Sequence, residues 1–340
     1  MGDAVHPSVF VVGAALAAVI LGPCRSAGPW SDEPAAPLPS LETAGSLRPD
    51  RTPLSLFADH ASRSAPTEWP VETAERGLAD ARESDVIDEP LHGPGITPEP
   101  TWRRLSGERL GGGRRGIELL VAVDRATFGP EQRPLHVTGL RRSRALLALP
   151  ILRDAVGLYP DGVLEKAGIR RIVVVGGLKR GEVKIGGVAL TVSGTLIVKP
   201  ARCRIGTETV LHHEVGHFLD HATAARKDPE WAALNPPGFQ YGEQPVDSLR
   251  LTTRTPGFLS AYATKHSQED KAELHRWLVT APGAVAGVAP SDPYLEAKMA
   301  LLGSRLEALD DRLDPEWWRK AWTQQQADRA HGIPPARLVR

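Results

Sequence analysis

Hydrophobic positions follow different patterns in different parts of this chain. Between residues 116 and 200, short runs rich in Val, Ile and Leu are bounded by glycines, which is typical of buried strands. Towards the C-terminus, apolar positions recur with the spacing of helices. We predict strands at Ile117–Val123, Ile169–Val175, Val183–Leu190 and Thr195–Val198. We predict helices at Arg142–Gly157 (interrupted at Pro150), Thr207–His221, Gln268–Thr280, Tyr294–Leu309 and Glu316–Asp328.

This order of elements predicts an α+β fold, in which a small mixed sheet backs the helix at Thr207–His221 and the C-terminal part is helical. We expect four large apolar residues of the C-terminal helices in the core, namely Met299, Trp317, Trp318 and Trp322. The aromatic, Pro-rich stretch from Trp231 to Tyr241 is read as a loop, which either lines a cleft or packs as plain structure.

The first residues are predicted to form an export signal. Residues 9–21 are an uncharged apolar run, too short to cross a bilayer comfortably but long enough for the core of a signal peptide. Residues 1–28 are therefore read as a signal peptide or N-terminal hydrophobic segment of a secreted or cell-envelope protein. The fit is imperfect, because Asp3 precedes the run and no Lys or Arg does. Leu21–Cys24 resembles a lipobox, but Pro23 stands where a small residue is usual, which argues against a lipoprotein.

Residues 29–115 are rich in Pro, Ala, Ser and acids and poor in long apolar side chains. Such a composition cannot offset the entropy lost on ordering, so we predict a disordered linker or pro-region with a transient helix near Val71–Arg82. The triplet Gly111–Gly113 marks its end. The folded domain is expected at 116–330, followed by a tail at 331–340.

Charge and cysteine content narrow the class of protein. The formal net charge is zero, which gives no support to nucleic-acid binding. The only cysteines are Cys24 and Cys203, so the chain has neither a disulfide framework nor a cysteine-based zinc site.

The helix predicted at Thr207–His221 contains the pattern H-E-x-x-H, as His213, Glu214 and His217. Positions i and i+4 of a helix share one face, so both imidazoles can bind one cation, while Glu214 lies about 100° round the helix. Neutral imidazoles suit zinc, and a carboxylate beside a zinc-bound water suits a general base for hydrolysis. Thr207 is a plausible N-cap. The alternative is a coincidental cluster of histidines, against which the apolar residues along the helix argue.

A hydrolytic zinc takes three protein ligands and one water, so a third donor must come from elsewhere. The arrangement H-E-x-x-H-x-x-G-x-x-H is excluded, because Asp220 and Thr223 stand where it requires glycine and histidine. Four other histidines remain as candidates, namely His212, His221, His266 and His275. His212 points about 100° away from His213, and His221 lies too far along the helix axis.

Glu269 and Glu273 are better candidates. Ser267 is a natural N-cap, which places Glu269 in the first turn of the next helix and Glu273 one turn later. Two carboxylates at i and i+4 repel each other on an exposed face but are both attracted to a cation. One can bind the metal while the other accepts a hydrogen bond from a ligand histidine. The alternative is a solvated acidic helix start that suits the helix dipole.

These motifs resemble a known family. H-H-E-x-x-H-x-x-D at 212–220, followed by S-x-Y-A at 260–263 and E-D-x-A-E at 269–273, resembles the bacterial zinc metallopeptidases of the gluzincin group. The active-site layout is similar to that of the catalytic domain of anthrax lethal factor, and the W…L-N-P…F-x-Y loop also resembles these families. The likeness covers roughly Leu119 to Leu309 and departs from the family pattern at His266, Ser267, Lys271, Leu274 and His275.

The resemblance implies a two-lobed zincin-like fold and one Zn²⁺ per chain. It implies that His213, His217 and Glu269 bind the zinc and that Glu214 is the general base. Glu273 would orient a ligand histidine, and Asp220 would be a further carboxylate supporting the ligands. Tyr262 matches the tyrosine that hydrogen-bonds the oxyanion in such enzymes, which is a sensible role for a phenol near a metal.

We therefore expect a zinc metallopeptidase that acts on a peptide or protein substrate, with no nucleic-acid partner and no membrane span beyond the N-terminal segment. The alternative is a zinc-binding or toxin-like interaction module that lost turnover. A third hypothesis, compatible with the first, is a self-processing enzyme whose N-terminal segment is removed between Ala27 and Arg115.

Overall fold

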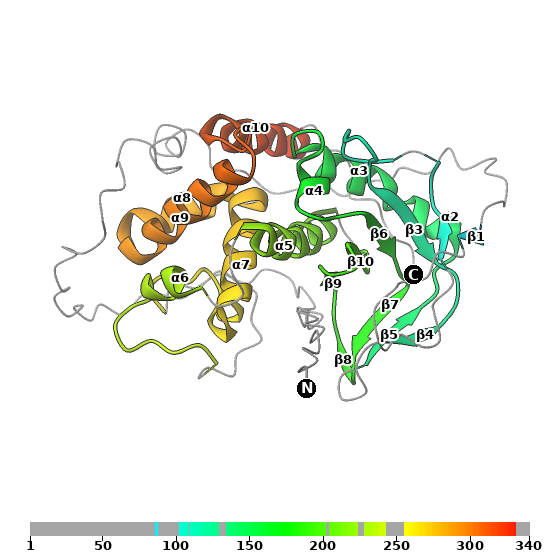
Figure 1. The fold of residues 1–340 in the computed structure, drawn as a ribbon, viewed down its shortest axis with the longest axis horizontal. Coiled ribbons are helices and arrows are strands. Elements are labelled where there is room, and N and C mark those ends of the chain that lie inside the picture. The colour runs from blue at the N-terminus through cyan, green and yellow to red at the C-terminus, as the bar shows by residue number, and fades with distance from the viewer. Residues whose placement is uncertain are drawn as a thin grey trace, which may run out of the picture.

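The computed structural model describes residues 86–87, 102–107, 109–128, 134–201, 204–223, 228–242 and 255–330. The predicted signal segment, both cysteines, the transient helix near Val71–Arg82 and the C-terminal tail lie outside these residues. Strands lie on one side of helix α5 (Arg204–Thr223), and most of the helices that follow it lie on the other (Figure 1). The described part of the chain is thus a mixed α+β fold, as predicted.

The larger sheet has six strands in the order β1-β2-β3-β6-β10-β9. Their bounds are β1 Val86–Ile87, β2 Trp102–Arg104, β3 Glu118–Ala122, β6 Arg171–Val174, β9 Gly187–Leu190 and β10 Thr195–Val198. The central strands β3, β6 and β10 are parallel, and the outer strands pair antiparallel. Strand β2 belongs to the stretch assigned to the linker, yet it pairs with β3 and buries Trp102. The domain boundary predicted at residue 116 is therefore too late, because one buried tryptophan in a polar stretch hardly alters its average composition.

A second sheet has four antiparallel strands in the order β4-β5-β7-β8. Their bounds are β4 Ala126–Phe128, β5 Leu135–Thr138, β7 Gly177–Arg180 and β8 Val183–Lys184. Strands β4, β5 and β7 are absent from the sequence prediction because they are short and partly polar. The strand predicted at Val183–Leu190 is two strands, β8 and β9, in different sheets. The chain bends between the sheets at Gly186–Gly187, where the lack of side chains favours a bend.

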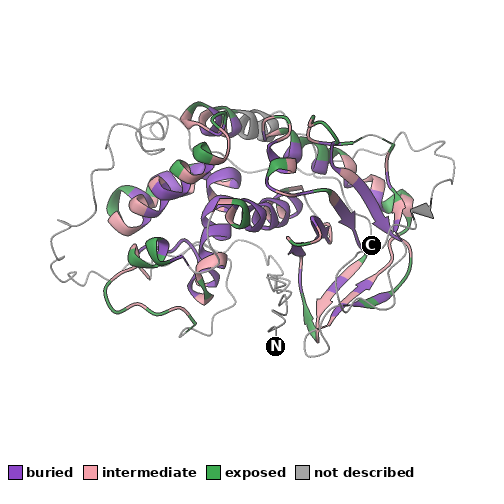
Figure 2. Ribbon diagram, in the orientation of Figure 1, coloured by how far each residue is buried: buried purple, intermediate pink, exposed green. Residues whose placement is uncertain are grey.

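The larger sheet is buried on both faces. Ile172 and Val174 of β6 belong to the main core, together with residues of the helices. Val173 of the same strand belongs to a smaller core that the four-stranded sheet covers. Successive side chains of a strand point to opposite faces, so burial on both faces explains why these strands read as continuous apolar runs (Figure 2).

The remaining helices agree with the predicted ones in part. Their bounds are α2 Arg142–Leu146, α3 Leu149–Gly157, α4 Val163–Lys166, α6 Pro229–Ala233, α7 Ser267–Thr280, α8 Pro282–Val288, α9 Pro293–Leu309 and α10 Pro315–Ala330, with 3-10 turns η2 Tyr262–Lys265 and η3 Ala289–Ser291. The break expected at Pro150 falls before Leu149, because proline fits the first turn of α3, where its missing N–H costs nothing. Short helices α4, α6 and α8 were not predicted. Helix α7 begins at Ser267 itself, so His266 and not Ser267 occupies its N-cap position. Helix α5 begins at Arg204, so Thr207 is not the N-cap of this helix. The Oγ1 of Thr207 instead accepts a hydrogen bond from the Ala201 N–H.

The C-terminal helices contribute to the main core as expected. Met299, Trp317 and Trp318 are buried, and Trp322 packs against them half-buried. Within the described residues, no helix is both long enough and apolar enough to span a membrane.

The glycine triplet at Gly111–Gly113 contacts α4 rather than ending a linker. The Glu165 carboxylate accepts hydrogen bonds from the N–H groups of Gly116 at 2.6 Å and Arg115 at 3.2 Å. A Cβ on Gly113 would lie 2.0 Å from Glu165 Oε1, so this close approach requires glycine. The loop thus wraps around a carboxylate of the folded domain.

We expect Glu165→Gln to lower the free energy of unfolding by about 1–2 kcal/mol, because backbone donors lose an ionised acceptor. Urea denaturation measures the change. Glu307→Gln, at an exposed position of α9, is the control and should leave the transition where it is. Equal midpoints for both variants would contradict the role of Glu165.

Candidate metal centre

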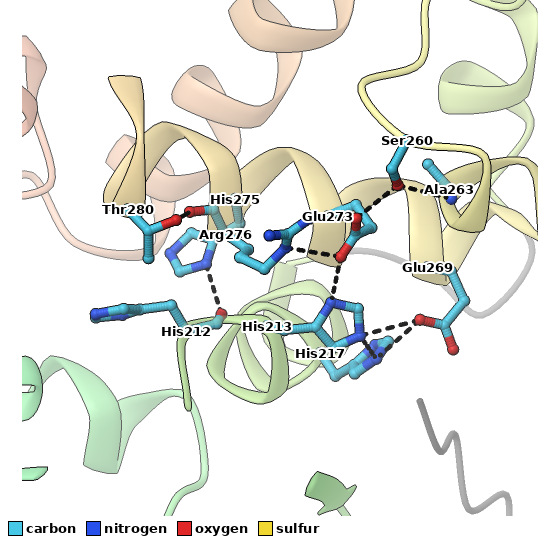
Figure 3. A network of polar contacts seen from close by, with 10 residues as sticks. All are labelled: His212, His213, His217, Ser260, Ala263, Glu269, Glu273, His275, Arg276 and Thr280. Atoms are coloured by element: carbon cyan, nitrogen blue, oxygen red, sulfur yellow. Dashed lines mark hydrogen bonds and ion pairs between the residues drawn. The ribbon is translucent and has the colours of Figure 1, made fainter. Parts of the chain in front are cut away.

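Helix α5 brings two imidazoles together. His213 and His217 are one turn apart, their ring centroids lie 4.8 Å from each other and their planes are nearly perpendicular. Their Nε2 atoms are separated by 3.2 Å, and both side chains are buried (Figure 3). The i, i+4 spacing in the sequence therefore does place both nitrogens at one point.

Helix α7 supplies the third group. Glu269 Oε2 lies 3.0 Å from His213 Nε2 and 3.5 Å from His217 Nε2 (Figure 3). One ligand atom from each of these three buried residues lies within 4.8 Å of the others. Tetrahedral zinc bonds of about 2.0–2.2 Å separate ligand atoms by roughly 3.4 Å, which matches this spacing. The group could therefore hold a metal ion.

The hydrogen bonds of His213 show why the centre favours a cation. Its Nδ1 lies 2.9 Å from Glu273 Oε1. Because a carboxylate accepts hydrogen bonds, Nδ1 carries the proton of the ring and donates a hydrogen bond to Glu273. In the neutral ring, the lone pair of Nε2 then faces Glu269 and the Nε2 of His217. Burial lowers the pKa of His213, but the hydrogen bonds and charges of Glu269 and Glu273 outweigh it and raise this pKa to about 10. Positive charge at this position is strongly stabilised, as a metal site requires.

Glu273 orients His213. Beside the His213 contact, it accepts a hydrogen bond from Ser260 Oγ at 2.6 Å and a bidentate pair from Arg276 at 2.8 and 2.6 Å (Figure 3). Burial raises the pKa of Glu273, but Arg276 and His213 outweigh it and lower this pKa to about 2. Glu273 is therefore an ionised acceptor that fixes the tautomer and the ring orientation of His213.

The two metal-ligand helices approach closely at Gly216 of the H-E-x-x-H motif. A Cβ on Gly216 would lie 2.9 Å from the Cα of Ala272 on α7. Since neither position carries more than a methyl group, the two backbones can pack near one another. This contact brings the carboxylates of α7 within reach of the imidazoles of α5.

Glu214 lies beside the three-residue group and is fully buried. Among the described residues, neither of its carboxylate oxygens has a hydrogen-bond partner. Burial raises its pKa to about 7, while the charges of His213, His217 and Arg180 oppose the shift. A carboxylate with this environment suits proton transfer near neutral pH.

Gly187 of strand β9 packs against Glu214. A Cβ at this position would lie 2.7 Å from Glu214 Cγ and 2.8 Å from its Oε1. The contact is a feature that the sequence analysis missed. Gly186–Gly187 was placed inside the predicted strand Val183–Leu190, and nothing in the sequence connects it to a residue of the next helix.

Tyr262 also lies at the centre, in the 3-10 turn before α7. Its ring centroid is 5.9 Å from that of His213, and the side chain is buried. Lys265 Nζ lies 4.5 Å from the ring centroid of Tyr262, on its face. The structure thus places the predicted tyrosine beside a ligand histidine.

Asp220 of α5 forms an ion pair with a lysine of α7. Its carboxylate accepts a hydrogen bond from Lys271 Nζ at 2.6 Å, and Lys271 also pairs with Asp228 at 2.7 Å. It therefore supports the packing of α5 against α7, and its support of a ligand histidine stays a prediction. Lys271, which departs from the family pattern, has this structural explanation.

None of the other candidate histidines joins the metal group, and a buried cluster accounts for two of them. Tyr159 OH lies 2.8 Å from His212 Nδ1 and 3.4 Å from His275 Nε2, while His275 Nδ1 donates to the backbone oxygen of His212. Burial lowers the pKa of His212 to about 3 and that of His275 to about 4, so both are neutral. His221 and His266 are exposed.

Comparison with protein-family models, with curated proteins and with solved structures finds no match.

Proposed function

We propose that this chain is a zinc-dependent metallopeptidase with a zincin-like, two-lobed catalytic domain. One observation carries the proposal: His213, His217 and Glu269 converge from two helices, with the buried carboxylate of Glu214 beside them. Two imidazoles, one carboxylate and an open fourth position are the ligand set of hydrolytic zinc sites. The proposed zinc ion would have His213 Nε2, His217 Nε2 and Glu269 Oε2 as its ligands.

When bound, zinc would lower the pKa of a water molecule and polarise the scissile carbonyl. Glu214 accepts the proton of the attacking water and later donates it to the leaving amine, a cycle that a pKa near 7 favours. Tyr262 donates a hydrogen bond to the oxyanion, and Glu273 keeps His213 in the tautomer whose Nε2 is a ligand.

Strand β9 supports a peptide as the substrate. Among the described strands it pairs only with β10 and lies at the end of the sheet, so no described strand pairs with its other edge. The bond from Lys199 N–H to Gly186 O fixes the register, so the backbone groups of Gly187 and Ala189 point away from β10. An extended peptide could pair with these groups, and it would then pass Glu214, which Gly187 contacts.

The alternative of a zinc-binding module without turnover has less support. Such a module needs the ligands but has no use for Glu214, a buried and unpaired carboxylate that costs stability. Retention of this group fits an enzyme.

Digestion of casein and of a peptide library by the purified chain tests the proposal. We expect cleavage that a chelator stops and that stoichiometric zinc restores. A complete absence of cleavage, or cleavage that the chelator leaves intact, would refute a zinc peptidase.

We expect Gly187→Ala to lower kcat/KM by about 10²-fold, because the new Cβ must displace the Glu214 side chain and a misplaced base is a poor catalyst. Zinc content should be unchanged, since no ligand moves. Gly157→Ala is the matched control, because a Cβ there meets nothing within 4 Å. Wild-type activity in Gly187→Ala would show that the contact does not position Glu214.

A further inference from the structure

Asp270, the residue after the proposed ligand Glu269, is the centre of a buried hydrogen-bond cluster. Its Oδ2 accepts hydrogen bonds of 2.8 Å from Trp231 Nε1, Tyr241 OH and Lys298 Nζ. These donors come from α6, from the loop after it and from α9, and the side chains of Trp231 and Lys298 are fully buried. One carboxylate oxygen therefore joins three separate elements to the metal-ligand helix α7.

Lys298 extends this cluster to the segment that precedes α7. Its Nζ donates to the backbone oxygen of Gly257 at 2.9 Å and lies 3.6 Å from the ring centroid of Phe258. The N–H of Gly257 donates to Asp292 Oδ2 at 2.6 Å. Lys298 of α9 and Asp292, the N-cap residue of this helix, thus hold both backbone polar groups of Gly257, which has a positive φ of 82°.

Gly257–Tyr262, which we call the tyrosine segment, leads from this anchor to the metal centre. Ser260 in its middle donates to Glu273, the carboxylate that orients His213. Tyr262 at its end lies beside the ring of His213. The segment is therefore held by Lys298 and Asp292 at one end and by Glu273 near the other.

A buried ion pair is a costly way to fill this space. The desolvation of both charges opposes folding, and a pair of apolar side chains of similar volume often gives the same stability or more. Burial accordingly lowers the pKa of Lys298, although Asp270 and Asp292 oppose the shift. The pair instead fixes the orientation of its two side chains, because hydrogen bonds hold each partner in one place.

We propose that Asp270 and Lys298 are positioning residues, which hold the tyrosine segment against α7 so that Tyr262 meets the reacting carbonyl of the substrate at a fixed distance. This inference rests on the proposed peptidase function. A buried charge pair that does not bind the metal would thus control where the oxyanion donor lies.

The test compares Lys298→Met, Asp270→Asn and the double variant, which leaves no uncompensated buried charge. Arg305→Met is the control, because it removes a largely buried cation from the same helix α9, where Arg305 pairs with Asp228 and Glu230 but not with the tyrosine segment. For each zinc-loaded protein, kcat and KM are measured for one peptide substrate. Hydrogen exchange of the backbone amides of residues 257–262 and the zinc dissociation constant are measured alongside.

We expect Lys298→Met to lower kcat by about 10–10²-fold with little change in KM, because the donor to the transition state is displaced. Exchange across the tyrosine segment should rise at least tenfold, and the zinc dissociation constant should increase, since Ser260 no longer supports Glu273. In a Tyr262→Phe background, Lys298→Met should change kcat by less than about threefold, because the group that it positions has been removed. Arg305→Met should leave kcat within about threefold of wild type.

Three results would overturn the inference. The first is a wild-type kcat in Lys298→Met, and the second is unchanged hydrogen exchange at residues 257–262. The third is a loss of kcat in the combined Lys298→Met and Tyr262→Phe variant that equals the product of the two single losses. Should Lys298→Met fail to fold, the double variant gives the same comparison. A wild-type chain without zinc-dependent cleavage would refute the peptidase proposal. Exchange and zinc affinity would then still decide whether the pair positions the tyrosine segment.

Discussion

Glu214→Gln is expected to reduce peptide hydrolysis by about 10³-fold or more while the protein still binds one zinc per chain. General-base catalysis contributes about 10²–10⁴-fold, and an amide cannot accept the proton of the attacking water. Glu214 is not one of the three converging groups, so its exchange for an isosteric amide leaves the metal ligands in place. The amide also removes the desolvation cost of a buried carboxylate, so thermal stability should be equal or higher.

The measurement combines kcat/KM for a fluorogenic peptide with zinc content by elemental analysis of the same sample. Glu208→Gln is a suitable control, since Glu208 is buried on the same helix but pairs with Arg204. It should keep nearly full activity. Activity near the wild-type level in Glu214→Gln would show that another group takes the proton.

Glu269→Ala is expected to weaken zinc binding by more than about 10²-fold and to abolish hydrolysis. Loss of an outer-shell partner alone costs about 10–100-fold in metal affinity, and removal of a ligand exceeds this. The variant also loses the carboxylate that, with Glu273, raises the pKa of His213 and favours positive charge at the centre. The remaining pair of imidazoles would bind a cation without a carboxylate ligand.

Competition with a chromophoric chelator measures the dissociation constant, and thermal unfolding gives an independent readout. At zinc concentrations about 100 times the dissociation constant, binding stabilises the wild type by about 2.7 kcal/mol, whereas Glu269→Ala should gain almost nothing. Glu230→Ala, a mostly exposed carboxylate of α6, is the control and should respond to zinc as the wild type does. An undiminished response in Glu269→Ala would remove Glu269 from the ligand set, and with it the proposed peptidase site.

Local spacing determined much of the candidate site. His213, Glu214 and His217 belong to one helix, so their mutual placement follows from 3.6 residues per turn and needs no knowledge of the fold. The same holds for Glu269 and Glu273 on α7. The apolar runs at 117–123, 169–175 and 195–198 predicted strands correctly, because a strand that is buried on both faces needs apolar residues throughout.

Relations between distant segments depended on packing. That Glu269 faces the imidazoles, while His212 and His275 bond to Tyr159, depends on how α5 crosses α7 near Gly216. A sequence pattern records neither this crossing nor the approach of Gly187 to Glu214.

Charged residues show the same division. The family resemblance implied that Asp220 supports the metal ligands, whereas its side chain accepts a hydrogen bond from Lys271, a residue on another helix. The sequence by itself determined which residues share a helix face or a strand, because these relations follow from backbone geometry within a few residues. Only the tertiary structure decided which faces meet, because that choice depends on the burial and pairing of side chains from distant parts of the chain.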